Sequence, residues 1–179
     1  MKNMIIGIAL VFVSISTHAQ IAIGGKQTIT NNSVSLEFDN TENRGLILPY
    51  VETKTGITEN GTIIYDVTDH KVKYLKEGST WVNLSEDDTT AATVGVADIS
   101  IQTTKVERTN AKTAIGANGA TDNTDGILVL TATDKAMILP KVASPHLNII
   151  NPAPGMMVYD TLKKQLAVYN GKVWSFWKP

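Results

Sequence analysis

The most constraining feature of this 179-residue chain is an internal duplication. The stretch from Ala22 to about Leu84 recurs from Ala114 to about Phe176, with an offset between the copies of 91 to 94 positions. The repeated positions are glycines, prolines and apolar or aromatic residues: Ala22-Ile23-Gly24 with Ala114-Ile115-Gly116, Leu36 with Leu128, Leu46-Ile47-Leu48-Pro49 with Met137-Ile138-Leu139-Pro140, Gly61 with Gly155, Tyr65-Asp66 with Tyr159-Asp160, and Gly78 and Trp81 with Gly171 and Trp174. Because these residue types set backbone turns and core faces, the duplication predicts two copies of one small scaffold.

Alternating polar and apolar residues predict strands in both copies. Residues 35–39 alternate as expected for a strand with one buried face. Each copy then predicts a three-strand meander, with strands at 62–66, 72–76 and 81–84 and at 156–160, 165–169 and 172–177. The second meander contains Asn170-Gly171, a strong hairpin signal. We therefore predict a mainly β fold: two duplicated small antiparallel β modules, each a strand, a proline loop and a three-strand meander, joined by a Thr-rich connector.

The repeat boundaries divide the chain into a signal peptide at 1–19, a first β module at 20–84, a connector at 85–112 and a second β module at 113–179. So long a connector favours two modules with a spacer over one globule. Its acidic start predicts a hinge. Its β-branched part at 94–106 predicts an added strand or a segment that lies against a neighbouring chain, and it disfavours a helix, because Thr, Val, Ile and Asp are weak helix formers.

The segment before the second meander is rich in proline. Pro145, Pro152 and Pro154 fall between residues 143 and 154. Proline removes a backbone donor and clashes with the preceding turn of a helix. These residues therefore predict an extended loop rather than a helix.

Residues 1–19 have the order of a Sec-type signal peptide: a short positive start, an apolar run and a small-residue end at Ala19. We therefore expect export to the cell surface or the extracellular space, with the periplasm as an alternative. No later segment stays apolar for the ~20 residues that a membrane-spanning helix needs, so we expect no membrane span in the mature chain.

Composition limits the partners of the mature chain. Without Lys2 it carries 15 basic and 17 acidic side chains, interspersed along the sequence. No basic stripe is present, which argues against nucleic-acid binding. Cysteine is absent, so disulfides cannot stabilise such short modules. Packing of the two copies together, or self-association of chains, must do so instead.

Three motifs carry a resemblance to a known kind of protein: Gly45-Leu46-Ile47-Leu48-Pro49-Tyr50-Val51, Gly61-Thr62-Ile63-Ile64-Tyr65-Asp66, and a Tyr/Gly/Trp ending that is clearest in Tyr169-Asn170-Gly171-Lys172-Val173-Trp174. This pattern resembles a recurring module of exported surface and tail-fibre-like proteins of the Bacteroidetes. The resemblance implies a fibre-like or adhesive role and transfers no functional residues. Tyr50 stands where that module usually has a basic residue, whereas Lys141 keeps the charge.

Catalysis has few candidate residues. The mature chain keeps only His70 and His146, each at a position that does not repeat. Their neighbours are ordinary loop residues, and no glycine-rich phosphate loop or close set of transition-metal ligands accompanies them. The sequence therefore favours a protein that is not an enzyme.

One loop has the composition of a calcium site. Asp122, Asn123 and Asp125 precede Gly126, and closely spaced oxygen ligands of this kind suit calcium. The same residues also favour tight turns for backbone reasons alone. Calcium is the one candidate ion, and no other cofactor is expected.

Candidate binding residues lie in the second copy, where it differs from the first. Trp177 falls on the opposite strand face from the repeated Trp174, so we expect it to be exposed. Lys141 replaces a tyrosine, and His146 lies in the proline-rich loop. We expect Trp81 and Trp174 to serve the core, because they occupy matching positions.

Two threonines match the Asp-Ser/Thr pattern at which Bacteroidetes attach O-glycans. Thr89 follows Asp88 in the acidic stretch, and Thr161 follows Asp160 in a turn. Both are candidate glycosylation sites on an exported chain.

These observations favour an exported, non-enzymatic structural or adhesive component of the cell surface, fibre-like and homo-oligomeric, with a trimer expected by analogy to fibres. Its partners would be other copies of itself and an envelope glycan or surface protein. The alternative is a carbohydrate- or peptide-binding module of the cell envelope. A third hypothesis is a hydrolase that uses His70 or His146.

Overall fold

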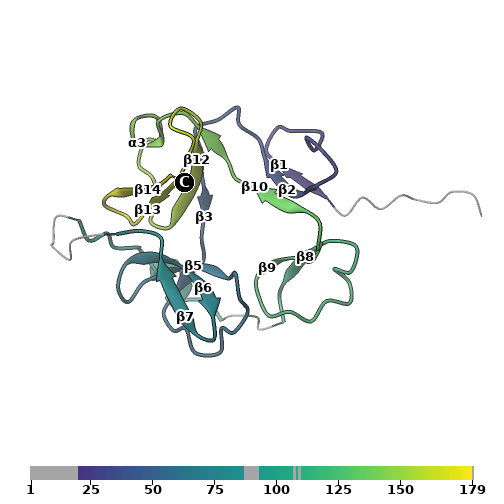
Figure 1. Cartoon of the computed structure of the whole chain (residues 1–179). Helices are drawn as coiled ribbons and strands as arrows, with labels where there is room; N and C mark the ends of the chain where they lie inside the picture. The colour runs from purple at the N-terminus through teal and green to yellow at the C-terminus, as the bar shows by residue number, and fades with distance from the viewer. Residues whose placement is uncertain (1–19, 87–92, 107, 109, 179) are drawn as a thin grey trace, which may run out of the picture.

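The computed structural model shows a mainly β protein and describes residues 20–86, 93–106, 108 and 110–178 (Figure 1). The predicted signal peptide lies outside these residues. The first copy contains β1 (Ile21–Ile23), β2 (Val34–Phe38), β3 (Leu46–Ile47), β4 (Tyr50–Val51), β5 (Ile63–Asp66), β6 (Lys71–Glu77) and β7 (Thr80–Asn83). The second contains β8 (Thr113–Ile115), β9 (Leu128–Leu130), β10 (Ala136–Ile138), β11 (Lys141–Val142), β12 (Met156–Asp160), β13 (Gln165–Tyr169) and β14 (Trp174–Trp177). The same strands recur in the same order, which confirms the predicted β-rich fold of two duplicated modules.

The strand registers match between the copies. β1 pairs in parallel with β2, and β8 pairs in parallel with β9 in the same stagger. The meanders β5–β6–β7 and β12–β13–β14 are antiparallel, as the sequence predicts. β4 and β11 each return after the repeated proline to pair in parallel with β5 and β12. The structure thus adds parallel pairs that the alternation pattern does not indicate.

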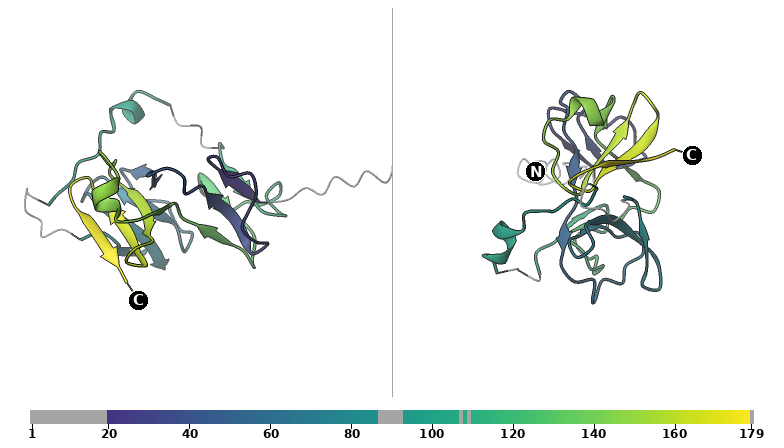
Figure 2. Two further views of the ribbon diagram at one scale, coloured as in Figure 1. Left: turned by 90° about the horizontal axis from the view of Figure 1, so that it is seen from above. Right: turned by 90° about the vertical axis from the view of Figure 1, so that its left-hand side faces the viewer.

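A short helix corrects the prediction for the connector. α2 (Ser100–Thr103) lies within 94–106, where the sequence disfavours a helix and allows a strand, so that part of the prediction is wrong. Asp98 accounts for the difference, because its carboxylate accepts the Ser100 N–H at 2.9 Å and starts a helical turn. In both views of Figure 2, α2 projects away from the sheets.

A second helix corrects the prediction for the proline-rich loop. α3 (Pro145–Asn148) forms where the sequence predicts an extended segment. Pro145 lies in the first turn of α3, where a missing N–H costs no helical hydrogen bond. Pro152 and Pro154 do lie in irregular backbone, as expected.

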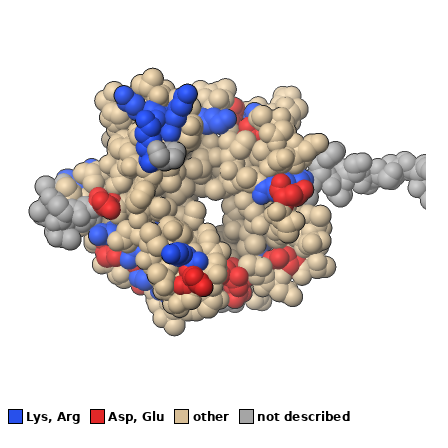
Figure 3. All heavy atoms as spheres, viewed as in Figure 1, with Lys and Arg blue, Asp and Glu red and all other residues tan. Residues whose placement is uncertain are grey.

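The two copies exchange a strand each. β3 of the first copy pairs antiparallel with β12, with Leu46 opposite Met157. β10 of the second copy pairs in parallel with β2, with Met137 opposite Leu36. Figure 1 shows β3 and β10 connecting the sheets of the two copies. Figure 3, from the same side, shows an opening through the molecule between β3 and the β8–β9 pair.

The copies also share a core. One buried cluster combines residues of both copies and of the connector: Leu48, Tyr65, Val72, Ala97, Met157 and Val168. A second cluster belongs to the second copy alone: Val142, Ile149, Met156, Val158 and Ala167. The β4–β7 sheet of the first copy is therefore covered by residues that come from outside that copy.

In the described part of the chain, no helix has the length and apolar character to span a bilayer.

Candidate functional site

The candidate site is an aromatic surface on the second copy, where His146 and Phe176 are exposed and Tyr169 and Trp174 are half-buried against the core of that copy. The rings of Tyr169 and Trp174 have centroids 5.2 Å apart, and Trp174 stacks on Phe176 at 6.5 Å. His146 meets Phe176 edge-on at 5.7 Å. Strand alternation places Trp174 and Phe176 on one face of β14, and α3 brings His146 beside them. We call these four residues the aromatic row.

Of the predicted binding residues, the structure places His146 in the aromatic row and Trp177 on the other face of β14. Trp177 is 42% exposed, and its indole N–H donates to the Leu84 carbonyl of the first copy. Lys141 is half-buried in β11, opposite Tyr159 of β12. The three predicted residues thus do not form one site. Phe176 was not among the binding residues predicted from the sequence, although it alternates with Trp174 in the predicted strand 172–177.

Two further large apolar side chains near His146 in the sequence are exposed, one in α3 and one just after it. Leu147 and Ile150 are both more than two-thirds exposed. Exposed apolar and aromatic side chains are suited to contact with a protein or a sugar ring.

His70 lies in a turn of the first copy, and His146 contacts the ring of Phe176 in the second. His70 has a φ of 61° in the turn between β5 and β6, and Lys164 has a φ of 55° in the matching turn of the second copy. His70 therefore fills a left-handed turn position that the fold needs in both copies. Across the described residues, no three His, Cys, Asp or Glu side chains gather as metal ligands would.

The repeated Asp160 has a structural environment. Its buried carboxylate accepts the N–H of Ser144 at 3.1 Å and of Leu162 at 2.9 Å, which ties the turn after β12 to the loop before α3. Burial alone would raise the pKa of Asp160, but hydrogen bonds from Ser144, Lys163 and Leu162 hold that pKa below its usual value. A carboxylate held ionised in this way is a poor proton donor.

Its counterpart Asp66 is equally buried and paired differently. Its carboxylate accepts hydrogen bonds from Thr68 and from the ammonium groups of Lys54 and Lys73, the latter at 3.2 Å. Burial opposes ionisation here too, yet the Lys54 and Thr68 hydrogen bonds hold the pKa of Asp66 far below its usual range. Both copies thus use the same aspartate to fasten the turn that follows their central strand.

The predicted calcium loop contains a lysine of its own. Asp122 accepts the Thr124 N–H at 3.0 Å. The Lys112 ammonium donates to the carbonyls of Asp122 and Thr124 at 2.6 and 3.0 Å and lies 3.5 Å from the Asp122 carboxylate. Asn123 and Asp125 lie in the same loop. Lys112 therefore supplies positive charge to this loop, and calcium there stays a prediction.

Of the two predicted glycosylation sites, Thr161 is exposed in the turn after β12. Thr89 lies outside the described residues. Both stay predictions.

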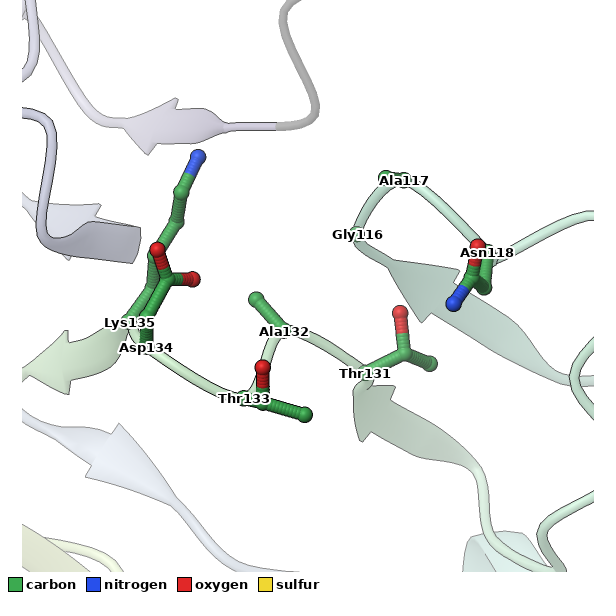
Figure 4. A pocket seen from close by; sticks show the side chains of 8 residues that line it. All are labelled: Gly116, Ala117, Asn118, Thr131, Ala132, Thr133, Asp134 and Lys135. Atoms are coloured by element: carbon green, nitrogen blue, oxygen red, sulfur yellow. The ribbon is translucent and has the colours of Figure 1, made fainter.

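A small pocket of about 170 Å³ lies between residues 116–118 and 131–135, at the ends of β8 and β9 (Figure 4). Asn118 and Thr131 line it near these strand ends, while Asp134 and Lys135 lie toward β10. Typical ligand pockets measure about 300–1,000 Å³. This pocket is therefore small for a sugar or a peptide.

The described residues thus present exchanged strands, an aromatic surface and two buried aspartates that fasten turns. Residues 114–178 match the model of a family described as phage tail like trimerisation region. The matched range is the second copy, from β8 to the end of β14. No curated protein and no solved structure matches the chain.

Proposed function

We propose that this protein is a structural, non-enzymatic component of a fibre-like assembly and that it self-associates as a trimer. The single observation that carries the proposal is the match of residues 114–178 to a trimerisation region, because it covers one complete structural repeat. The first copy has the same strand order and is the natural second element of such an assembly.

Physical arguments support self-association. Small β modules bury a modest share of their surface, and unpaired strand edges favour pairing with another chain. Several large apolar side chains of the second copy are exposed, among them Leu128, Tyr159 and Phe176. Their burial between chains would contribute about 25 cal/mol for each Å² removed from water.

We further propose that the assembly is exported and acts at the cell surface or outside the cell, with adhesion as one of its roles. The signal-peptide pattern of residues 1–19 and the Bacteroidetes-like motifs support this location.

The test is the mass of the mature chain, residues 20–179, by light scattering and native mass spectrometry over a hundredfold concentration range. We expect three times the chain mass. A mass of one chain at every concentration would overturn the proposal. The temperature midpoint of unfolding should also rise with concentration, because association stabilises the folded state by mass action.

A second candidate function is carbohydrate or peptide binding through the aromatic row, and the exposed Phe176 beside His146 favours it. Binding to a glycan and peptide array is the test. Phe176→Ala should abolish the signal if the row is the contact surface, whereas Trp177→Ala, on the opposite face, should do so if the sequence prediction is right. Unchanged binding by both variants would exclude both surfaces.

A further inference from the structure

The exchanged strands β3 and β10 each use one of their two edges. The N–H of Leu48 donates to Gly155 at 3.1 Å, so Leu46 and Leu48 direct their backbone groups toward β12. The N–H of Ala136 donates to Ser33 at 2.9 Å, so Ala136 and Ile138 direct theirs toward β2. The backbone groups of alternate residues in a strand point to opposite edges. Among the described residues, the edge of β3 at Ile47 and the edge of β10 at Met137 therefore have no partner strand.

The duplication identifies what these edges fit. Leu46 corresponds to Met137, and Ile47 corresponds to Ile138. β3 therefore shows that the Met137 edge suits a strand of the β12 type, and β10 shows that the Ile47 edge suits a strand of the β2 type. The counterparts of those two strands in the other copy are β5 and β9.

β5 and β9 have the matching vacancies. Within the described residues, β5 pairs with β4 only at Tyr65 and Asp66, which leaves Ile63 without a strand on that side. Among the strands that the structure describes, β9 pairs only with β8. The chain thus contains two strands that pair along one edge only, β3 and β10. It also contains two strands that could pair with their other edges, β9 and β5.

Burial differs between the copies at the same places. Leu36 of β2 is fully buried, whereas its counterpart Leu128 of β9 is 45% exposed. Tyr65 of β5 is fully buried, whereas its counterpart Tyr159 of β12 is 37% exposed. Leu128 lies on β9, which lacks an exchanged strand, whereas Tyr159 lies on β12, which already pairs with β3.

The repeated glycine shows the same difference. A Cβ on Gly155 would lie 2.9 Å from Tyr65, whereas a Cβ on Gly61 would meet nothing within 4 Å. Both glycines have left-handed backbone, with φ of 72° and 86°. Tyr65 packs on Gly155 of the other copy, so the exposed Tyr159 has an open counterpart surface at Gly61.

We propose that a second copy of this chain completes the exchange. β10 of one copy pairs antiparallel with β5 of the neighbour, with Met137 opposite Ile63 and Ile138 opposite Thr62. β3 of the neighbour pairs in parallel with β9, with Leu46 opposite Leu128. Tyr159 covers Gly61 of the neighbour. The contact is head-to-tail, so it is satisfied at every chain only when the assembly closes. This inference rests on the proposed self-association and specifies its interface.

Engineered cysteines test the register, because the natural chain has none. Thr62→Cys with Ile138→Cys places two thiols opposite each other in a pair without mutual hydrogen bonds, where Cα atoms lie about 4.5 Å apart and a disulfide fits. The matched control is Ile47→Cys with Met156→Cys, the corresponding pair inside the chain. Light scattering of the reduced variants shows whether each retains the mass of the natural protein.

On oxidation, Thr62→Cys with Ile138→Cys should give covalent oligomers on a non-reducing gel, whereas the control pair should give an intramolecular disulfide at the mass of one chain. Single-cysteine variants should give neither product above background. If the paired variants fail to fold, Leu46→Cys with Leu128→Cys reports on the parallel half of the same junction and should also link chains.

Two results would overturn the inference while leaving self-association intact. In one, the natural protein is a trimer, yet neither inter-chain pair forms a disulfide. In the other, Ile47→Cys with Thr62→Cys links the chains instead, which means that like copies pair with like. If light scattering gives the natural protein the mass of one chain, the proposed self-association itself is contradicted.

Discussion

The hydroxyl of Tyr65 in the first copy donates to the carbonyl of Asn170 in the second at 2.8 Å, and both residues are fully buried. The same hydroxyl lies 3.3 Å from the carbonyl of Gly95 in the connector. The Asn170 side chain donates to the Thr93 carbonyl at 2.9 Å. Three segments far apart in the sequence thus meet at one buried polar junction.

Tyr65→Phe tests this junction. The variant leaves buried carbonyl oxygens without their donor, so the free energy of unfolding should fall by about 1–3 kcal/mol. Tyr159→Phe is the matched control, because it keeps the ring that would cover Gly61 of a neighbour and removes only a hydroxyl, so it should change stability by less than about 0.5 kcal/mol. Urea denaturation followed by tryptophan fluorescence measures both. Equal changes in the free energy of unfolding for the two variants would mean that the Tyr65 hydrogen bonds do not stabilise the fold.

Gly95→Ala tests the close approach of the connector to the second copy. A Cβ at this position would lie 2.0 Å from the Asn170 carbonyl oxygen, which is a backbone atom that cannot turn aside. We expect a loss of about 1–3 kcal/mol in the free energy of unfolding, as for other overpacked sites. The exposed neighbour Val96→Ala should be almost neutral. A stable Gly95→Ala variant would contradict the packed connector.

Gly155→Ala and Gly61→Ala separate packing within the chain from packing between chains. Both glycines have positive φ, so each alanine costs about 1–2 kcal/mol of backbone strain. Gly155→Ala should be the more destabilising variant, because its Cβ also clashes with Tyr65. Gly61→Ala should instead shift the mass by light scattering toward one chain. Identical behaviour of the two variants would argue against the inferred contact of Tyr159.

The buried aspartates predict a loss of stability in acid. The folded-state pKa values of Asp66 and Asp160 lie below the value of about 3.9 expected in the unfolded chain. Their stabilising contribution is therefore complete above that pH and is lost as the pH falls through it toward the folded pKa values. Urea midpoints between pH 6 and pH 2.5 should show this decline.

Asp160→Asn identifies the group responsible for part of that decline. The amide cannot ionise, so the variant should be less stable at pH 6 by about 2 kcal/mol and should lose less stability in acid. The exposed Asp134→Asn is the control and should keep the natural pH dependence. A natural slope in Asp160→Asn would show that other groups cause the decline.

The sequence predicts the antiparallel meanders because their signals are local. Asn170 lies in the predicted hairpin turn, where its side-chain oxygen accepts the N–H groups of Lys172 and Val173 at 2.8 Å each. Alternation and this turn fix the register of β13 and β14 without reference to the rest of the chain. The repeated Tyr-Asp motif likewise marks the end of the central strand in both copies.

The strand exchange could not be predicted because nothing local encodes it. Leu46-Ile47-Leu48-Pro49 and Met137-Ile138-Leu139-Pro140 are nearly the same sequence, yet β3 pairs with β12 and β10 pairs with β2. The partner of each depends on where the rest of the chain places it. The predicted exposure of Trp177 needs only the local alternation of a strand. Its hydrogen bond to Leu84 and the position of His146 in the aromatic row depend on tertiary packing.

The exchange of β3 and β10 has a consequence for the order of folding. The first copy is synthesised before β10 and β12 exist, so the β10 partner of β2 and the β12 partner of β3 are missing until nearly the whole chain is available. Contacts between residues so distant in sequence form slowly, and chains that wait for them remain open to wrong pairing. A nascent or truncated chain of this protein should therefore be the species most prone to aggregate. The two copies adopt one joint structure only when β10 and β12 pair with strands of the first copy.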